Sequence, residues 1–148
     1  MPVKSKPDAY HTVTPYLVVE GAARLIDFAK AAFGAQETER LAAPEGRIGH
    51  AELRIGDSLV MLADAHGGRA PMPCMLHVYV DDADATYQRA LDAGATSIEQ
   101  PANKFYGDRG GLVSDPCGNL WWIATHIEDV PPDELKRRAA EVMRGAHG

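Results

Sequence analysis

The chain repeats one pattern of strand and helix. Residues 18–35, VVEGAARLIDFAKAAFGA, align with residues 79–96, YVDDADATYQRALDAGAT, with Val19 over Val80. In both segments apolar residues recur at helical spacing and a glycine follows them, as is common just past a helix end. An internal duplication of this kind predicts two copies of one structural unit, so the architecture of the whole chain follows from that of half of it.

Strands are predicted on both sides of each helix. The first unit has strands at 11–19, 37–41, 47–55 and 59–64, and the second has strands at 74–80, 96–99, 111–114 and 120–126. Each unit therefore has the order βαβββ. We expect an α+β fold whose tandem modules, residues 12–64 and 74–126, form a curled mixed sheet with a cleft and are joined by a Gly- and Pro-rich linker at 65–73. A last helix is predicted at about 132–144, opened by prolines and acids.

Composition argues against several classes of function. The net charge of -6 and the pI near 5.4 disfavour nucleic acid and anionic membrane as partners. The one dense basic run, residues 136–138, lies among acids and is typical of a solvated helix face. The N-terminus has no signal-like apolar core, and no apolar run is long enough to cross a bilayer. We expect a cytoplasmic protein in which Cys74 and Cys117 are reduced.

Five strings follow one another in a characteristic order. They are TPYLVVEGAARLIDF, GHAELRIGDSLVMLAD, FYGDRGG, DPCGNLWWIATHIEDV and the Pro-Pro-Asp-Glu-Leu start of the last helix. Together they resemble the vicinal oxygen chelate superfamily of glyoxalases, bleomycin resistance proteins and dioxygenases, and more closely its PhnB-like branch. The resemblance spans Thr12 to Met143. It implies that each module supplies half of a cleft around a metal or ligand, and that the protein is a homodimer.

The resemblance also places the usual metal ligands, His, Gln or Glu, on the first and last strands of each module. Those positions fall on Thr14, Met61, Met75 and Trp122. A thioether is too soft for the relevant metals and an indole has no lone pair to offer. The sequence therefore predicts that the usual metal site is lost and that no cofactor is needed. A divalent metal relocated to His50, Glu52 and His77 stays open as an alternative.

Strand alternation predicts which side chains line the cleft. The predicted set is Tyr16, His50, Glu52, Met61, His77, Tyr79, Trp122 and His126. A histidine or carboxylate in a partly dry cleft acts as a general base or orients a polar ligand, and His77 and Glu52 are the candidates for a base. The alternative for any one of them is an ordinary solvated or hydrogen-bonded side chain.

A loop at 105–109 completes the predicted site. Phe105 and Tyr106 are expected to roof the cleft, while Arg109 either binds a carboxylate or phosphate group or forms an ion pair that fixes the loop. We expect a metal-independent protein that binds a small molecule between its modules. The alternatives are a metal-dependent glyoxalase-type lyase, isomerase or dioxygenase, and a metal-free enzyme with His77 or Glu52 as base.

Overall fold

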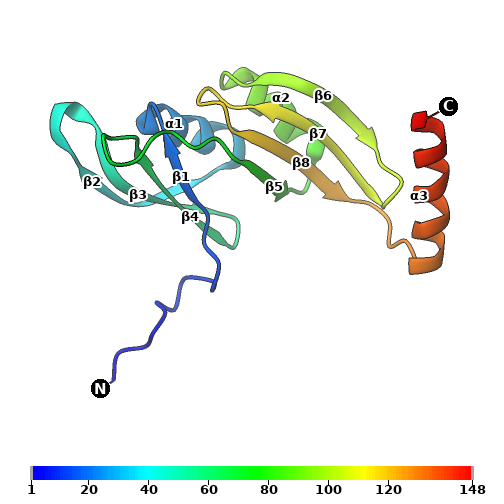
Figure 1. Ribbon diagram of the computed structural model, residues 1–148, viewed down its shortest axis with the longest axis horizontal. Coiled ribbons are helices and arrows are strands. Elements are labelled where there is room, and N and C mark those ends of the chain that lie inside the picture. Colours follow the sequence, from blue (N-terminus) through cyan, green and yellow to red (C-terminus); the bar gives the residue numbers. More distant parts are fainter. Residues whose placement is uncertain (1, 148) are drawn as a thin grey trace.

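The computed structural model describes residues 2–147, which form two four-stranded sheets and three α-helices (Figure 1). The first unit contains β1 (Tyr16–Val19), α1 (Ala22–Phe33), β2 (Gln36–Ala42), a 3-10 turn η1 (Pro44–Gly46), β3 (Ile48–Ile55) and β4 (Ser58–Asp64). The second contains β5 (Met75–Tyr79), α2 (Ala83–Asp92), β6 (Thr96–Asn103), β7 (Asp108–Ser114) and β8 (Leu120–His126). Helix α3 (Pro132–His147) follows. The predicted α+β fold of tandem βαβββ units is confirmed.

The two sheets have the same topology. Their strand orders are β1-β4-β3-β2 and β5-β8-β7-β6, and in each the first strand runs parallel to the last while the other pairs are antiparallel. Tyr16 pairs with Met61 in the first sheet and His77 with Trp122 in the second. Both members of one pair are offset by 61 positions from those of the other (16 to 77 and 61 to 122). The duplication predicted from the helices therefore extends to strand register.

One hydrophobic core joins the two units. Its buried members come from both, among them Leu17, Leu25, Ile26, Phe28, Leu53, Leu62, Tyr87, Trp121 and Ile123. The ring of Phe33 at the end of α1 lies 4.7 Å from that of Trp121, centroid to centroid, and Arg89 of α2 donates to the carbonyl of Ala32. The sheets consequently lie side by side and are not closed on each other (Figure 1). The sheet faces away from the helices carry exposed side chains such as Tyr79 and Met75.

Two aspartates fix the ends of strands that carry the site. Asp64, at the end of β4, accepts hydrogen bonds from the backbone N–H groups of Gly21, Ala22 and Ile48, and so caps α1. Asp115 accepts from the backbone of Cys117 and Asn119, and from the side chains of Asn119 and Trp121. Asn119 in turn accepts from the N–H of Cys74 just before β5. These contacts set the positions of β4, β5 and β8.

The observed strands differ from the predicted ones by more than one residue at an end at three places. Strand β1 begins at Tyr16 and not at residue 11, since Pro15 has no N–H to donate to a ladder. Strands β6 and β7 are longer than the predicted 96–99 and 111–114. In β7 the glycines at 110 and 111 are packing positions, because a Cβ at Gly110 would collide with the indole of Trp122.

Candidate ligand-binding site

The open face of the first sheet carries four of the predicted residues close together. Tyr16 on β1 and Glu52 on β3 both pair with Met61 on β4, so the three side chains share one face. The hydroxyl of Tyr16 lies 3.1 Å from His50 Nδ1, and His50 Nε2 lies 3.2 Å from Glu52 Oε1. A phenol, an imidazole and a carboxylate are thus joined in one chain of polar contacts.

The N-terminal segment adds a residue that the sequence did not suggest. The hydroxyl of Tyr10 is buried beside Glu52 without a well-aligned hydrogen bond among the described residues. Burial, with the Glu52 charge alongside, raises the pKa of Tyr10 to about 12. Tyr10, and then His50, lower the pKa of Glu52 despite the opposing effect of burial. Glu52 is therefore ionised at neutral pH and acts as an acceptor.

The second sheet presents an aromatic surface in the equivalent place. His77 pairs with Trp122, and its ring lies 4.6 Å from that of Tyr79, centroid to centroid. Trp122 itself is only 8% exposed. The ammonium of Lys104 lies 5.4 Å from the centroid of its ring, as the guanidinium of Arg69 lies 5.9 Å from that of Tyr16. At the centre of the predicted cleft, the rings of Tyr16 and Trp122 are thus each covered by a cationic side chain.

A second polar cluster lies at the end of β8. Asp108 is buried, and its carboxylate accepts from the Tyr79 hydroxyl and from His126 Nδ1, each at 2.8 Å. His126 Nε2 lies 2.7 Å from the exposed carboxylate of Asp129. The hydrogen bonds to Asp108 first and to Asp129 second raise the pKa of His126. A cavity of 360 Å³ lies beside His126 and Tyr79, and is also lined by Val80, Asp81 and Thr125. The imidazole is held in one orientation next to open space.

The guanidinium of Arg109 is occupied by side chains of the same chain, so it is not free to bind an anion. Its guanidinium makes a bidentate ion pair with Asp84 of α2, at 2.7 and 3.0 Å, and donates to Asn103. Of the two predicted roles for Arg109, the geometry favours the ion pair that fixes the loop. Phe105 and Tyr106 in this loop make an edge-to-face contact of 5.3 Å between ring centroids.

A larger cavity of 670 Å³ lies where the two units meet. Its lining includes Phe33 and Ile55 from the first unit, and Leu76 and Arg89 from the second. Of the predicted site residues, only His77 and Tyr79 are part of it. Strand alternation could not have located this cavity, because it depends on how the two units pack against each other.

The match to known proteins agrees with this geometry. A family model described as the Glyoxalase/Bleomycin resistance protein/Dioxygenase superfamily matches residues 10–123. The chain belongs to this superfamily. An uncharacterised protein of Mycobacterium tuberculosis is 40% identical over 135 residues, which are 84% of this chain and 79% of that protein. A protein of Mycobacterium bovis matches at the same identity over 84% of this chain and 89% of its own length.

Solved structures share the fold of this chain. TioX from Micromonospora sp. ML1 superposes with a TM-score of 0.67 at 26% identity, covering 79% of this chain and 99% of TioX. The PhnB protein from Bacillus cereus superposes with a TM-score of 0.63 at 16% identity, covering 78% of this chain and 99% of its own. These similarities show that the fold is shared.

The side chains at the centre of the sheets are a poor set of ligands for the metal of the metal-dependent members. The paired positions hold Tyr16 with Met61 and His77 with Trp122, which offer one imidazole and no carboxylate. Among residues 2–147, no group of three or more His, Cys, Asp or Glu side chains is arranged to hold a metal ion.

In that same part of the chain, no helix has the length and apolar character needed to cross a membrane.

Proposed function

We propose that this protein binds a small organic molecule, without a metal, on the open sheet faces of its two modules. The observation that carries the proposal is the set of side chains at the paired central positions: Tyr16, Met61, His77 and Trp122. Aromatic and thioether groups supply apolar contact, and the imidazole of His77 supplies a hydrogen bond. The ligand we expect is largely apolar, with a planar part and at least one polar group.

The polar clusters flank this apolar centre. On the first sheet His50 and Glu52 reach the Tyr16 hydroxyl, and on the second Tyr79 and His126 reach Asp108. Since the two sheet faces are open in a single chain, we further propose a homodimer in which a second copy covers them. We further propose a cytoplasmic location, because Cys74 and Cys117 are both free thiols, as is usual in a reducing compartment.

A library of small organic molecules, screened by thermal denaturation in the presence of EDTA, tests the proposal. A ligand should raise the midpoint of unfolding of the native protein, because it binds the folded state alone. The variant His77→Ala should lose at least tenfold in affinity for that ligand, while His66→Ala, in the exposed linker, should bind as the native protein does. Ligands that bind only when EDTA is replaced by a divalent metal would contradict the proposal.

A metal-free enzyme is the second candidate. The sequence suggested His77 or Glu52 as its base, but the contacts of His126 favour that residue. A buried carboxylate orients the ring from Nδ1, and among the described residues Nε2 contacts only the exposed side chain of Asp129. Small carbonyl compounds incubated with the protein in D₂O would reveal proton abstraction as loss of C–H signals in the NMR spectrum. The exchange should vanish in His126→Gln and persist in His66→Gln.

A further inference from the structure

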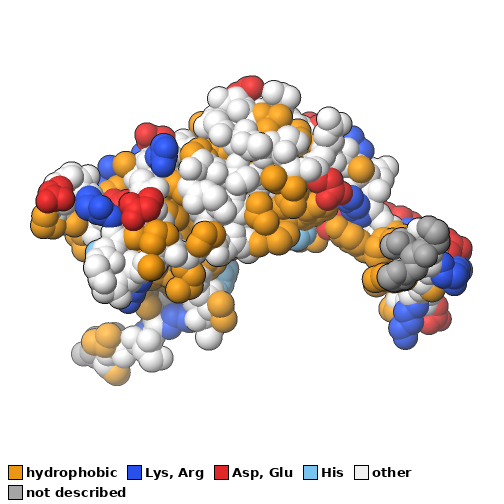
Figure 2. Space-filling view, turned by 45° about the horizontal axis from the view of Figure 1, so that its top comes forward, with side chains coloured by type: hydrophobic (Ala, Val, Ile, Leu, Met, Phe, Trp, Pro, Cys, Tyr) orange, Lys and Arg blue, Asp and Glu red, His pale blue; other side chains and the backbone are white. Residues whose placement is uncertain are grey.

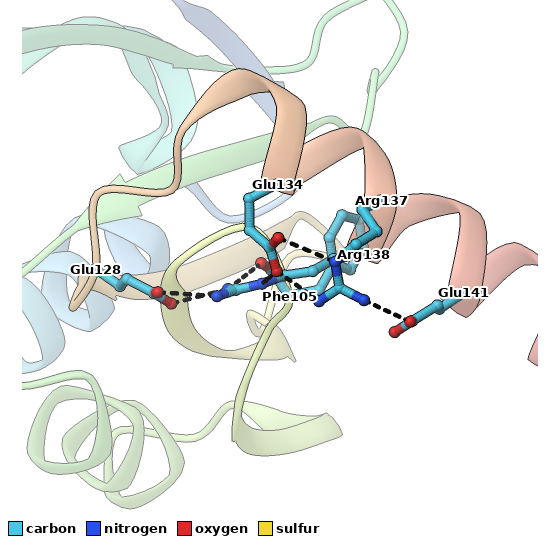
Figure 3. A network of polar contacts seen from close by, with 6 residues as sticks. All are labelled: Phe105, Glu128, Glu134, Arg137, Arg138 and Glu141. Carbon is cyan, nitrogen blue, oxygen red and sulfur yellow. Dashed lines mark hydrogen bonds and ion pairs between the residues drawn. The ribbon is translucent and has the colours of Figure 1, made fainter.

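Helix α3 stands apart from the body of the protein (Figures 1 and 2). Its first turns are fixed by Arg138, which donates to the carbonyl of Phe105 and forms ion pairs with Glu128 and Glu134 (Figure 3). The bonds to Glu128 are 2.9 and 3.0 Å long, and that to Phe105 is 3.1 Å long. The helix is therefore attached at its base in a defined direction.

One apolar stripe runs along α3. Leu135 and Ala139 are half-buried near the base, and Val142 and Met143 continue the same face one turn further on. There the body no longer covers it, so that Val142 is 47% exposed and Met143 62% exposed. A helix face that starts in contact with its own chain and continues uncovered points to a contact with another molecule.

We propose that α3 is an arm whose stripe, defined as Leu135, Ala139, Val142 and Met143, packs on a second copy of this chain. The inference rests on the homodimer proposed above and assigns residues to it. In a dimer with two-fold symmetry each copy gives one arm and receives the other, so every contact of the stripe is made twice.

The size of the stripe favours a second copy as the partner. A stable interface buries about 800 Å² on each partner, which is more than four side chains supply. A second copy contributes its own arm and, in addition, the open sheet faces, where Tyr16, Met75 and Tyr79 are 41%, 57% and 63% exposed. A second copy therefore has more exposed apolar surface to cover than the stripe alone offers.

Charge disfavours a lipid surface as the partner. Helices that lie on anionic membranes present unpaired Lys and Arg beside their apolar face. In α3 the guanidinium of Arg137 is paired with Glu134 and Glu141, and Arg138 is paired with Glu128 and Glu134. Two of the three bases in the run at 136–138 are therefore paired with acids of the same chain.

The test compares two single substitutions that add the same charge on opposite faces of α3. Val142→Asp lies in the stripe, while Ala140→Asp lies outside it and projects to the opposite side of the helix from Val142, and both positions are exposed. The dissociation constant of the dimer is measured by sedimentation equilibrium over about 1–100 μM protein. We expect Val142→Asp to raise it at least tenfold and Ala140→Asp to change it less than twofold. Near-ultraviolet circular dichroism checks that both variants are folded.

Each other outcome overturns the inference in a distinguishable way. A native protein that stays monomeric at about 100 μM removes both the arm and the homodimer. A dimer that Val142→Asp leaves unchanged, or that both variants weaken equally, removes the arm and leaves the homodimer. Binding of the native protein to phosphatidylserine vesicles that Val142→Asp abolishes, without any dimer, would make the stripe a membrane contact.

Discussion

Replacing Asp115 with alanine should destabilise the protein more than any other change in a turn. Its carboxylate, 5% exposed, accepts four hydrogen bonds of 2.8–3.0 Å from Cys117, Asn119 and Trp121. Hydrogen bonds to a charged group contribute about 1.5–3 kcal/mol each, and bonds that share one acceptor are not additive. The substitution also leaves the buried N–H of Trp121 without its partner. We expect the free energy of unfolding to fall by about 3–5 kcal/mol.

Urea denaturation followed by tryptophan fluorescence measures this loss, since Trp121, which donates to Asp115, and Trp122 both lie on β8. The matched control is Asp57→Ala in the equivalent turn of the first unit, where the exposed carboxylate accepts only from the Ser58 hydroxyl among the described residues. Its effect should stay within about 0.5 kcal/mol. A loss below about 1 kcal/mol for Asp115→Ala, or equal losses for the two variants, would refute the view that Asp115 holds β8 in place.

Three further predictions follow from the contacts around the site. Burial opposes the charge of Asp64, but hydrogen bonds from three backbone N–H groups lower its pKa. The carboxylate therefore stabilises the fold above the pKa that Asp64 has in the unfolded chain, and this stabilisation is lost as the pH falls through the lower pKa of the folded protein. Acid denaturation of Asp64→Asn should accordingly depend less steeply on pH than that of the native protein. The raised pKa of His126 should fall towards the ordinary value of about 6.5 in Asp108→Asn, as measured by NMR titration of the imidazole. Gly107→Ala should cost about 2–3 kcal/mol in urea denaturation, because φ at Gly107 is +99°, which L side chains rarely adopt, and a Cβ there would collide with the backbone carbonyl of Glu128.

Much of the fold is predictable because it depends on local pattern. Helical spacing and strand alternation identified both βαβββ units, and the offset between the two helices predicted that Met61 and Trp122 occupy equivalent positions, as the strand registers show. The first three residues of β7, 108–110, were missed, because Gly107 and Gly110 on either side of Asp108 and Arg109 suggest a loop by composition. Only the approach of Trp122 and of strand β6 explains why glycine is needed there.

The candidate site is less predictable, because the side chains that contact one another in it come from distant segments of the chain. Strand alternation grouped His50, Glu52 and Tyr16, but it gave no reason to add Tyr10 from the N-terminal segment. Nor did the sequence tell which acid pairs with which base: Arg109 binds Asp84, 25 positions away, while Asp108 binds Tyr79 and His126. Lys104 over Trp122 likewise depends on how the loop before β7 folds back.

The central claim is that a small molecule is bound without a metal, and elemental analysis tests it most directly. The purified protein is analysed as isolated, and again after incubation with nickel, manganese, iron or zinc followed by desalting. The account predicts that no metal remains at a stoichiometric level under any of these conditions. One metal ion per chain, lost on replacing His50 or His77 with alanine, would contradict it and would favour the relocated-metal enzyme.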